Sequence, residues 1–322
     1  MILRLSDTQK RIYDFLYSEM VKGHYTITLP RDFPKNSINI IVKLVLGDHP
    51  ELINFDNCCV YFGRYANATS LSLQPVFSDQ EFPAAQKRFD SEVQRILRQV
   101  IKPNATPIQR VLAIHDYLVN HVVYDHDDAS GRKPSILSHT AYGAIVNKKA
   151  VCEGISYAFS LLAHQAGIEA TVVNGMAGGE HAWNMVRINS EHYHMDVTWD
   201  IRKRANPKVK AYDYFCLSDH DLRHRNWEKA LYPVCNSARY NYFQVTKSFA
   251  HNKKQLREII FRQYKQYKAL YLKHDFLHME SARVIDYIWN ELLSVATEKG
   301  LSVDKVTCVL NDDQNIFILY SQ

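Results

Sequence analysis

The chain has 322 residues, of which 46% are hydrophobic and 23% are charged, a composition typical of folded globular proteins. This composition excludes a disordered, collagenous or fibrous chain, and the length predicts two or three domains. The net charge of +5 is small for this size, so nucleic acid is not an expected partner. No apolar stretch approaches the ~20 residues that a membrane span requires.

The N-terminus and the cysteines indicate where the protein works. Charges interrupt the first residues at short intervals, without the apolar core or the small-residue cleavage site of a secretory signal. We therefore expect a cytoplasmic protein, with leaderless export left open. The six cysteines show no CxxC pair and no regular spacing, which favours free thiols over disulfides.

Residues 1–81 are expected to form a small N-terminal α+β domain without a catalytic motif. A helix should begin after the cap Ser6, because apolar residues follow it at helical spacing. The other elements expected here are a strand at 25–28, a helix at 38–46 that ends near Gly47, and strands at 59–62 and 71–76.

Residues 82–235 should form a second domain that begins with two helices. The first covers 82–101, and the second begins at Thr106, where Pro107 and Gln109 complete a capping box. His115 lies within the apolar stripe of the second helix. A histidine in that position is expected to be a hydrogen-bonded core residue rather than a catalyst.

Residues 236–322 should form a third, α+β domain rich in aromatic and basic residues. Its expected elements are strands at 240–245, 306–310 and 316–320 and helices at 252–273 and 281–298. The helix at 252–273 is strongly basic on one face, with Tyr264, Tyr267 and Tyr271 on the other. We expect a solvated basic face; an acidic partner or a membrane surface is the alternative, both here and for the basic loop 202–210.

Cys152 is the first residue that indicates chemistry. It lies at the start of a helix in which Ile155, Phe159 and Leu162 recur at helical spacing, and Gly167 ends the segment. The unpaired N–H groups and the dipole of a helix N-terminus favour a thiolate over a thiol. Cys152 is therefore a candidate nucleophile, although a small buried hydrophobic residue is the usual role of a single cysteine.

Two strands after this helix bring a histidine and a carboxylate together. If Asn189-Ser190 is a two-residue turn, Trp183 lies opposite Asp196, and His181 is a diagonal neighbour of Asp196 on one face. A three-residue loop would place them on opposite faces, so the inference depends on the register. The neighbouring histidines 192 and 194 are expected to serve strand packing.

Cys152, His181 and Asp196 supply a nucleophile, a base and an orienting acid in that chain order. A thiolate attacks an amide or ester carbonyl, an imidazolium protonates the leaving amine, and a carboxylate fixes the imidazole tautomer. Hydrolysis, glutamine deamidation and acyl transfer to an amine share one thioacyl intermediate. The sequence does not separate these three outcomes.

Three motifs resemble the transglutaminase-like cysteine enzyme superfamily, and specifically its bacterial branch. They are Ile114-His-Asp-Tyr-Leu118 with Tyr124-Asp125, Ala141-Tyr-Gly143 leading to Val151-Cys-Glu-Gly154, and His181-Ala-Trp-Asn184 with Asp196-Val-Thr-Trp-Asp200. The resemblance covers about residues 108–235 and implies an α+β, papain-like core in which a nucleophile helix packs on an antiparallel sheet. It implies that Cys152, His181 and Asp196 are catalytic, and that the substrate is a peptide or protein.

Further candidate site residues lie around these three. Tyr142 is a candidate oxyanion-hole donor beside the N–H of Cys152, with a core tyrosine as the alternative. Glu153, Trp183 and Trp199 are candidates to line the substrate cleft. Ile155 departs from the aromatic residue usual in this branch. No cofactor is expected. Paired CxxC zinc ligands, typical of the related peptide N-glycanases, are absent.

Two alternatives compete with this interpretation. A metal site formed by Cys216, His220, His224 and Cys235 has no standard spacing, and residues 217–222 fit a surface helix better, so no metal is expected. A non-catalytic binding module for a protein or glycan would keep the fold, but such modules typically lose the cysteine or the histidine. The oligomeric state is not predicted.

Overall fold

The computed structural model describes residues 3–30, 33, 35–56, 61–65, 68–203 and 211–321. The chain forms two compact units, residues 1–202 with 217–237 and residues 203–216 with 238–322. The expected boundary near residue 235 falls close to the end of the first unit, whereas the one at residue 81 falls inside it. The division into three domains stays a prediction.

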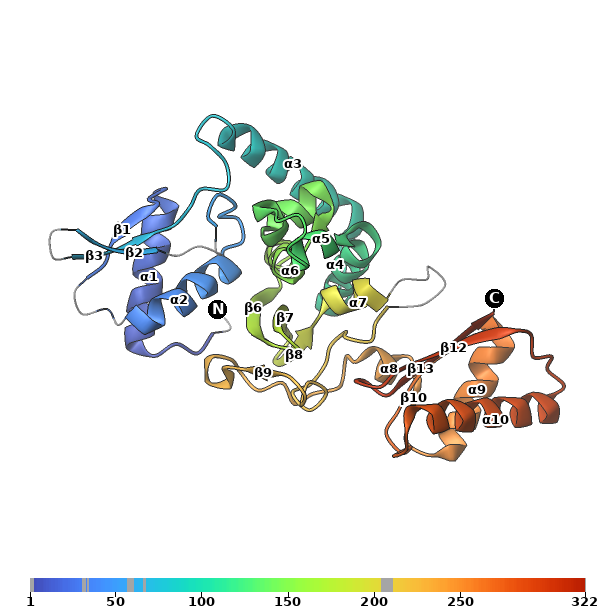
Figure 1. The fold of residues 1–322 in the computed structure, drawn as a ribbon. Coiled ribbons are helices and arrows are strands. Elements are labelled where there is room, and N and C mark those ends of the chain that lie inside the picture. The colour runs from blue at the N-terminus through green and yellow to red at the C-terminus, as the bar shows by residue number, and fades with distance from the viewer. Residues whose placement is uncertain are drawn as a thin grey trace. The chain divides into compact units, whose positions relative to one another are not determined.

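The first unit begins with two helices and a small sheet (Figure 1). Ser6 caps the first helix as expected, because the Gln9 N–H donates to Ser6 Oγ at 3.3 Å. Asp48 joins this part to the central sheet by accepting hydrogen bonds from Tyr13 and Thr171. The elements are α1 (Asp7–Val21), α2 (Lys35–Asp48), and the strands β1 (Thr26–Thr28), β2 (Tyr61–Tyr65) and β3 (Ala68–Ser72), in the order β1-β3-β2.

The strand expected at 71–76 is displaced toward the N-terminus. β3 ends at Ser72, and the next residues pair instead with 54–56, because Pro75 has no N–H for a ladder and forms only an isolated bridge with Phe55. Of the strand expected at 59–62, residues 59 and 60 lie outside the described residues, and the other two open β2.

The two helices expected after residue 81 are confirmed as α3 (Phe82–Val100) and α4 (Pro107–His121). The Thr106 N–H donates to Gln109 Oε1 at 2.9 Å, as the predicted capping box requires. Short elements then lead to the next long helix. They are β4 (Val123–Tyr124), α5 (His126–Ala129), the 3-10 helix η1 (Ile136–His139), the π-helix η2 (Gly143–Asn147) and β5 (Lys149–Ala150).

The central helix α6 (Cys152–Gln165) packs on an antiparallel sheet (Figure 1). Its apolar side chains, among them Ile155, Phe159 and Leu162, are fully buried. The sheet has the order β8-β7-β6-β9 and consists of β6 (Glu169–Met176), β7 (Glu180–Ile188), β8 (Glu191–Met195) and β9 (Asn226–Trp227). The α+β, papain-like arrangement of a helix on an antiparallel sheet is therefore the fold of this unit.

The hairpin of β7 and β8 has the register of the two-residue-turn alternative. Ile188 pairs with Glu191 across a two-residue turn, in which Asn189 adopts φ +57°, a conformation that asparagine tolerates. β8 ends at Met195, and α7 (Val197–Lys203) follows because Asp196 Oδ1 accepts the Trp199 N–H at 3.0 Å.

The surface helix expected at 217–222 is wrong. Leu217 forms a bridge with His194, the following residues form turns, and the side chains of Leu217 and Leu222 are buried. A short 3-10 helix, η3 (Lys229–Leu231), completes the first unit.

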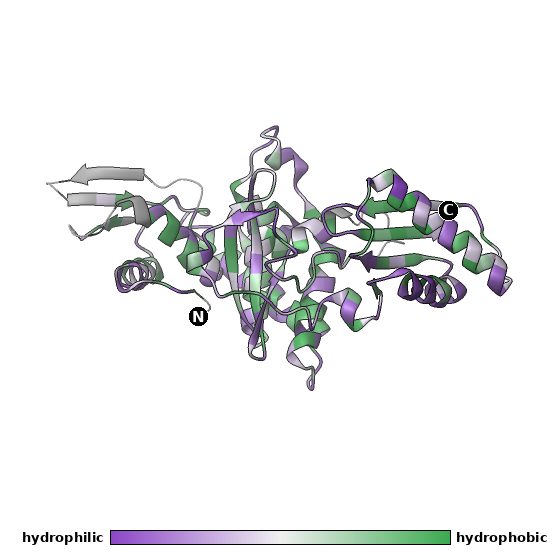
Figure 2. Cartoon of the chain, turned by 90° about the horizontal axis from the view of Figure 1, so that it is seen from below, coloured by the Kyte–Doolittle hydropathy of each residue, from purple (hydrophilic) through white to green (hydrophobic). Residues whose placement is uncertain are grey.

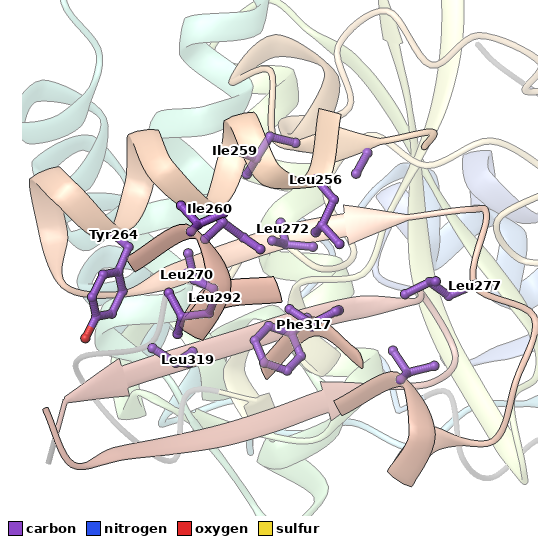
Figure 3. Packing of buried hydrophobic residues seen from close by; sticks show 14 residues of the cluster. Leu256, Ile259, Ile260, Tyr264, Leu270, Leu272, Leu277, Leu292, Phe317 and Leu319 are labelled. Carbon is purple, nitrogen blue, oxygen red and sulfur yellow. The ribbon is translucent and has the colours of Figure 1, made fainter. Parts of the chain in front are cut away.

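The second unit has a four-stranded sheet, and two long helices pack on it. Figure 3 shows Leu256 and Ile260 of one helix pointing toward Leu272 and Phe317 of the sheet in this unit. Figure 2 shows its strands to be mainly hydrophobic, while its helices carry hydrophilic residues as well. The sheet order is β10-β11-β13-β12. The elements are α8 (Tyr242–Val245), β10 (Phe249–Ala250), α9 (Lys253–Tyr267), β11 (Leu270–His274), α10 (Ser281–Lys299), β12 (Val306–Asn311) and β13 (Ile316–Ser321).

Two predictions in this unit are wrong and three are confirmed. The strand expected at 240–245 is a helical turn, because the Asn241 side chain caps it by accepting the Phe243 N–H. The helix expected at 252–273 ends at Tyr267, since Lys268 adopts φ +52°, and the buried run 270–274 forms a strand. The last helix and the last two strands form where they were expected.

The basic face of α9 is compensated by neighbouring groups. Lys253 and Arg257 pair with Glu291 at 2.6 and 2.7 Å, and Arg262 donates to backbone carbonyls. Tyr267, expected on the packed face, is exposed. These ion pairs favour the solvated-face interpretation over a binding surface. The side chains of the basic loop 202–210 lie outside the described residues.

Candidate active site

Cys152 is the first residue of α6, as the sequence predicts. The residue before it, Val151, is extended, so the chain enters the helix abruptly. A Cβ on Gly154 would lie 2.5 Å from the carbonyl oxygen of Ser138 and 2.7 Å from that of Thr140. The absence of a side chain at Gly154 therefore lets the η1 segment pack directly against the first turn of the helix, beside Cys152.

His181 and Asp196 meet as the predicted register requires. His181 Nε2 lies 2.8 Å from Asp196 Oδ2, and both side chains are almost completely buried. His181 is the second residue of β7, and Asp196 directly follows β8. A hydrogen bond and an electrostatic interaction also link His181 to Cys152. Since Nε2 is held by Asp196, Nδ1 is the ring nitrogen left for the thiol.

These contacts favour the ionised forms of both members of the pair. Burial lowers the pKa of His181, but the charge and hydrogen bond of Asp196, together with Cys152, outweigh it and raise the pKa to about 9. Burial raises the pKa of Asp196, but His181 and Arg225 outweigh it and lower the pKa to about 2. An imidazolium paired with a carboxylate is therefore the stable state near neutral pH.

Arg225 also belongs to the candidate active site, although no sequence motif indicates it. Its Nη1 lies 2.6 Å from Asp196 Oδ2, and its guanidinium lies over the rings of Trp183 and Trp199. It stands 29 residues after Asp196, in a stretch without regular structure. No spacing rule connects such a residue to the triad, so only the three-dimensional structure identifies it.

A cavity of about 700 Å³ opens onto Cys152 and His181. This volume lies within the range of small-molecule and peptide sites. Among the charged wall residues, His139 lies 2.8 Å from Asp128 and 3.1 Å from Glu153. The walls come from α2, α5, β6, β7 and the segment at η3, and include Ile40, Lys43, Leu44, Tyr124, Asn174, Met176, Glu180, Glu228, Leu231 and Tyr232. Although residues 1–81 carry no catalytic motif, α2 thus forms part of the wall.

The structure places the four remaining site candidates differently. Glu153 lines the cavity, as predicted for a cleft residue. Trp183 and Trp199 do not line the cavity. Both rings pack near the His181 ring, with centroid distances of 5.9 Å. Tyr142 is buried against Phe77 and lies outside the cavity lining. This packing favours a core tyrosine over an oxyanion donor, and the donor role stays a prediction.

His115 is a buried core histidine, as expected. Its Nε2 lies 2.9 Å from Asp200 Oδ2, and neither side chain is accessible to solvent. Burial lowers the pKa of His115, but hydrogen bonds to Asp116 and Asp200 raise it to about 9. His115 does not line the cavity, so its charge pair serves the fold.

Metal-ligand atoms come close together at one place in the part of the chain that the structure describes. His194, Asp219 and Cys235 lie within 4.8 Å of one another. Trp183 Nε1 donates to His194 Nδ1 at 3.1 Å, so the proton of the neutral ring is on Nε2 and donates to Asp219 at 2.9 Å. A metal at Nε2 would move that proton to Nδ1, facing the indole N–H. The cluster is thus a hydrogen-bonded network that does not suit a metal.

Comparisons with known proteins identify a family for part of this chain. Residues 94–197 match the core model of the family described as the transglutaminase-like superfamily. Residues 94–197 therefore carry a transglutaminase-like domain. None of the helices in the described ranges is both long enough and apolar enough for a bilayer span.

The relatives of this transglutaminase-like chain match only part of it. Human kyphoscoliosis peptidase is 25% identical over 148 residues, which are 40% of this chain and 21% of that protein. Mouse kyphoscoliosis peptidase is 21% identical over 177 residues, 48% of this chain and 26% of that protein. A crystal structure of a TGase is similar with a TM-score of 0.32 and 16% identity, and covers 54% of this chain and 50% of that one. The chain therefore matches about a quarter or less of the curated relatives.

Proposed function

We propose that the protein is a cysteine-nucleophile enzyme that acts on amide bonds of peptides or proteins. Cys152 is the nucleophile, His181 the acid and base, and Asp196 the orienting acid. The observation that carries this proposal is the 2.8 Å contact between His181 and Asp196, with His181 also linked to Cys152 at the mouth of a cavity.

The reaction follows from the chemistry of these three groups. The Cys152 thiolate attacks the carbonyl carbon, and the N–H of Cys152 at the start of α6 stabilises the oxyanion. His181 then gives its Nδ1 proton to the leaving nitrogen as the C–N bond breaks, which leaves a thioester and a neutral imidazole. Water or an amine attacks the thioester and loses its proton to His181. The thiolate–imidazolium pair is thereby restored.

Hydrolysis is the outcome that we favour, and acyl transfer to an amine is the second. The curated relatives are named peptidases, which supports hydrolysis. Both outcomes use the same thioester and differ in the group that attacks it. Assaying a labelled glutamine peptide with and without a primary amine separates them, because transfer gives an amine adduct and hydrolysis gives a free acid.

Selective alkylation of Cys152 tests the proposal without a known substrate. Iodoacetamide labelling between pH 4 and 9 is followed by peptide mass spectrometry, and Cys308, also half-buried, serves as the internal standard. Burial raises the pKa of Cys308, so it should react slowly below pH 8. We expect Cys152 to react at least tenfold faster than Cys308 near pH 6.

The matched control separates the proposed base from a neighbouring histidine. His181→Ala should remove the advantage of Cys152 at pH 6, while His192→Ala, on β8 outside the cavity, should keep it. Equal labelling of Cys152 and Cys308 in the wild type would contradict the proposal. In that case the chain is better described as a non-catalytic binding module.

A further inference from the structure

Arg225 carries an inference that rests on the proposed function and extends it. We propose that Arg225 is a positioning residue that keeps Asp196 paired in both protonation states of His181, and so allows His181 to release its proton. Arg225 lies outside the cavity lining and does not reach the reacting atoms. It acts through the carboxylate.

The carboxylate of Asp196 is shared between two cationic partners. Its Oδ2 accepts from His181 Nε2 at 2.8 Å and from Arg225 Nη1 at 2.6 Å, while Oδ1 accepts the Trp199 N–H at 3.0 Å. Asp196 is 1% exposed, so these donors replace water almost completely. A buried carboxylate with this set of donors has one fixed orientation.

Two tryptophans hold Arg225 in place. Its guanidinium carbon lies 5.2 Å from the ring centroid of Trp183 and 4.6 Å from that of Trp199, and its side chain is 3% exposed. An arginine side chain does not lose its proton in proteins, and its flat guanidinium stacks on aromatic faces. The site therefore contains a permanent positive charge, whereas the charge of His181 changes during the reaction.

The permanent charge affects how easily His181 gives up its proton. With only His181 as a partner, loss of the Nδ1 proton to the leaving amine would leave Asp196 as an unpaired buried anion, which is costly. Asp196 would then favour the protonated form of His181, and proton transfer from His181 to the leaving amine would be slower. Arg225 removes this cost, because Asp196 stays paired when His181 is neutral.

Two other titratable groups lie close to this pair. Cys152 faces His181 from α6. His194 on β8 lies near Arg225; burial lowers the pKa of His194, Arg225 adds to that effect, and Asp219 opposes it. His194 therefore stays neutral and does not replace Arg225 as a cation for Asp196.

The experiment measures the protonation of His181 in the full-length protein. Histidine-labelled protein is titrated by NMR of the ring protons, and the His181 signal is assigned by its loss in His181→Ala. In Arg225→Gln, which removes the charge but keeps hydrogen-bond donors, we expect the pKa of His181 to rise by about one unit. Arg225→Lys, which keeps the charge, should stay close to the wild type. Cys152 alkylation profiles are recorded for the same variants.

Each outcome either supports or overturns the inference. An unchanged His181 pKa in Arg225→Gln overturns it, even if the variant is less stable. If Arg225→Gln does not fold while Arg225→Lys folds, Arg225 is only a structural counter-ion and the inference also fails. Failure of the proposed function is a separate result: in that case Cys152 of the wild type shows no dependence on His181, whatever the Arg225 variants do.

Discussion

Replacement of Gly154 should show how closely Cys152, the proposed nucleophile, is positioned. In Gly154→Ala the new methyl group would lie 2.5 and 2.7 Å from two backbone carbonyl oxygens of the segment 138–140. Ordinary contact requires about 3.4 Å, so either the first turn of α6 or the η1 segment has to move by about 0.7–0.9 Å. Neither is a flexible side-chain end.

The expected energy is the difference between two opposing effects. Alanine is about 1 kcal/mol better than glycine inside a helix. Overpacking typically costs about 1–3 kcal/mol of stability. Because the atoms in contact here are backbone atoms, which yield less than side-chain ends, we expect a cost of about 3 kcal/mol. The net loss is therefore about 2 kcal/mol. A displacement of about 1 Å next to the nucleophile should also lower Cys152 labelling near pH 6 by up to about a hundredfold.

Urea unfolding and labelling of Cys152 measure the two effects separately. Gly179→Ala is the matched control, since a Cβ there meets nothing within 4 Å and the residue has no positive φ. It should change the free energy of unfolding by less than about 0.5 kcal/mol. Wild-type stability and wild-type labelling in Gly154→Ala would refute the steric argument, because they would mean that the contact can relax at no cost.

Buried groups carry three further predictions. His115→Leu should lower the free energy of unfolding by about 3–5 kcal/mol, measured by urea, because it leaves Asp200 buried without this partner. Tyr142→Phe should keep the wild-type rate of cleavage of the labelled glutamine peptide, because the ring packs against Phe77 and does not line the cavity. The charged pair of His181 and Asp196 should make its full contribution to the free energy of unfolding between about pH 4 and 6.5. Its contribution should fade as the pH rises from 6.5 through about 9, or falls from 3.8 through about 2.

Other results would contradict these three predictions. A loss below about 1 kcal/mol in His115→Leu would show that Asp200 is solvated or protonated at little cost. A tenfold loss of peptide cleavage in Tyr142→Phe, with Cys152 labelling unchanged, would identify the tyrosine as an oxyanion donor. For the pair, the wild type is compared with His181→Gln by urea unfolding at several pH values. A difference in stability that is equal at pH 6 and pH 9.5 would show that the imidazolium does not stabilise the fold.

Local sequence patterns predicted the parts of the structure that depend on neighbouring residues. The cap at Ser6 and the capping box at Thr106 act over a few residues, so both could be read from the chain. The two-residue turn at Asn189 was one of two alternatives that the chain allowed. The turn then fixed the register that brings His181 to Asp196. This contact was predictable because a single turn connects the two strands.

The features that were missed depend on contacts between distant segments. Lys268 ends α9 in a conformation that usually favours glycine, and the buried run that follows pairs with β13 rather than continuing the helix. Arg225 reaches Asp196 from a segment of irregular structure. Ile40 lines the cavity from α2, although it belongs to no motif that would have linked it to the site. Such contacts form only when the chain folds, so no local sequence pattern predicts them.

The cavity walls extend well beyond the stretch that matches the family model. That stretch covers residues 94–197, whereas Ile40, Glu228 and Tyr232 all lie outside it and still line the cavity. The proposed reacting groups and much of the cavity wall therefore come from different parts of the chain. A shortened protein that keeps only the matched stretch would retain Cys152 and His181 but lose much of the wall that decides which substrate reaches them.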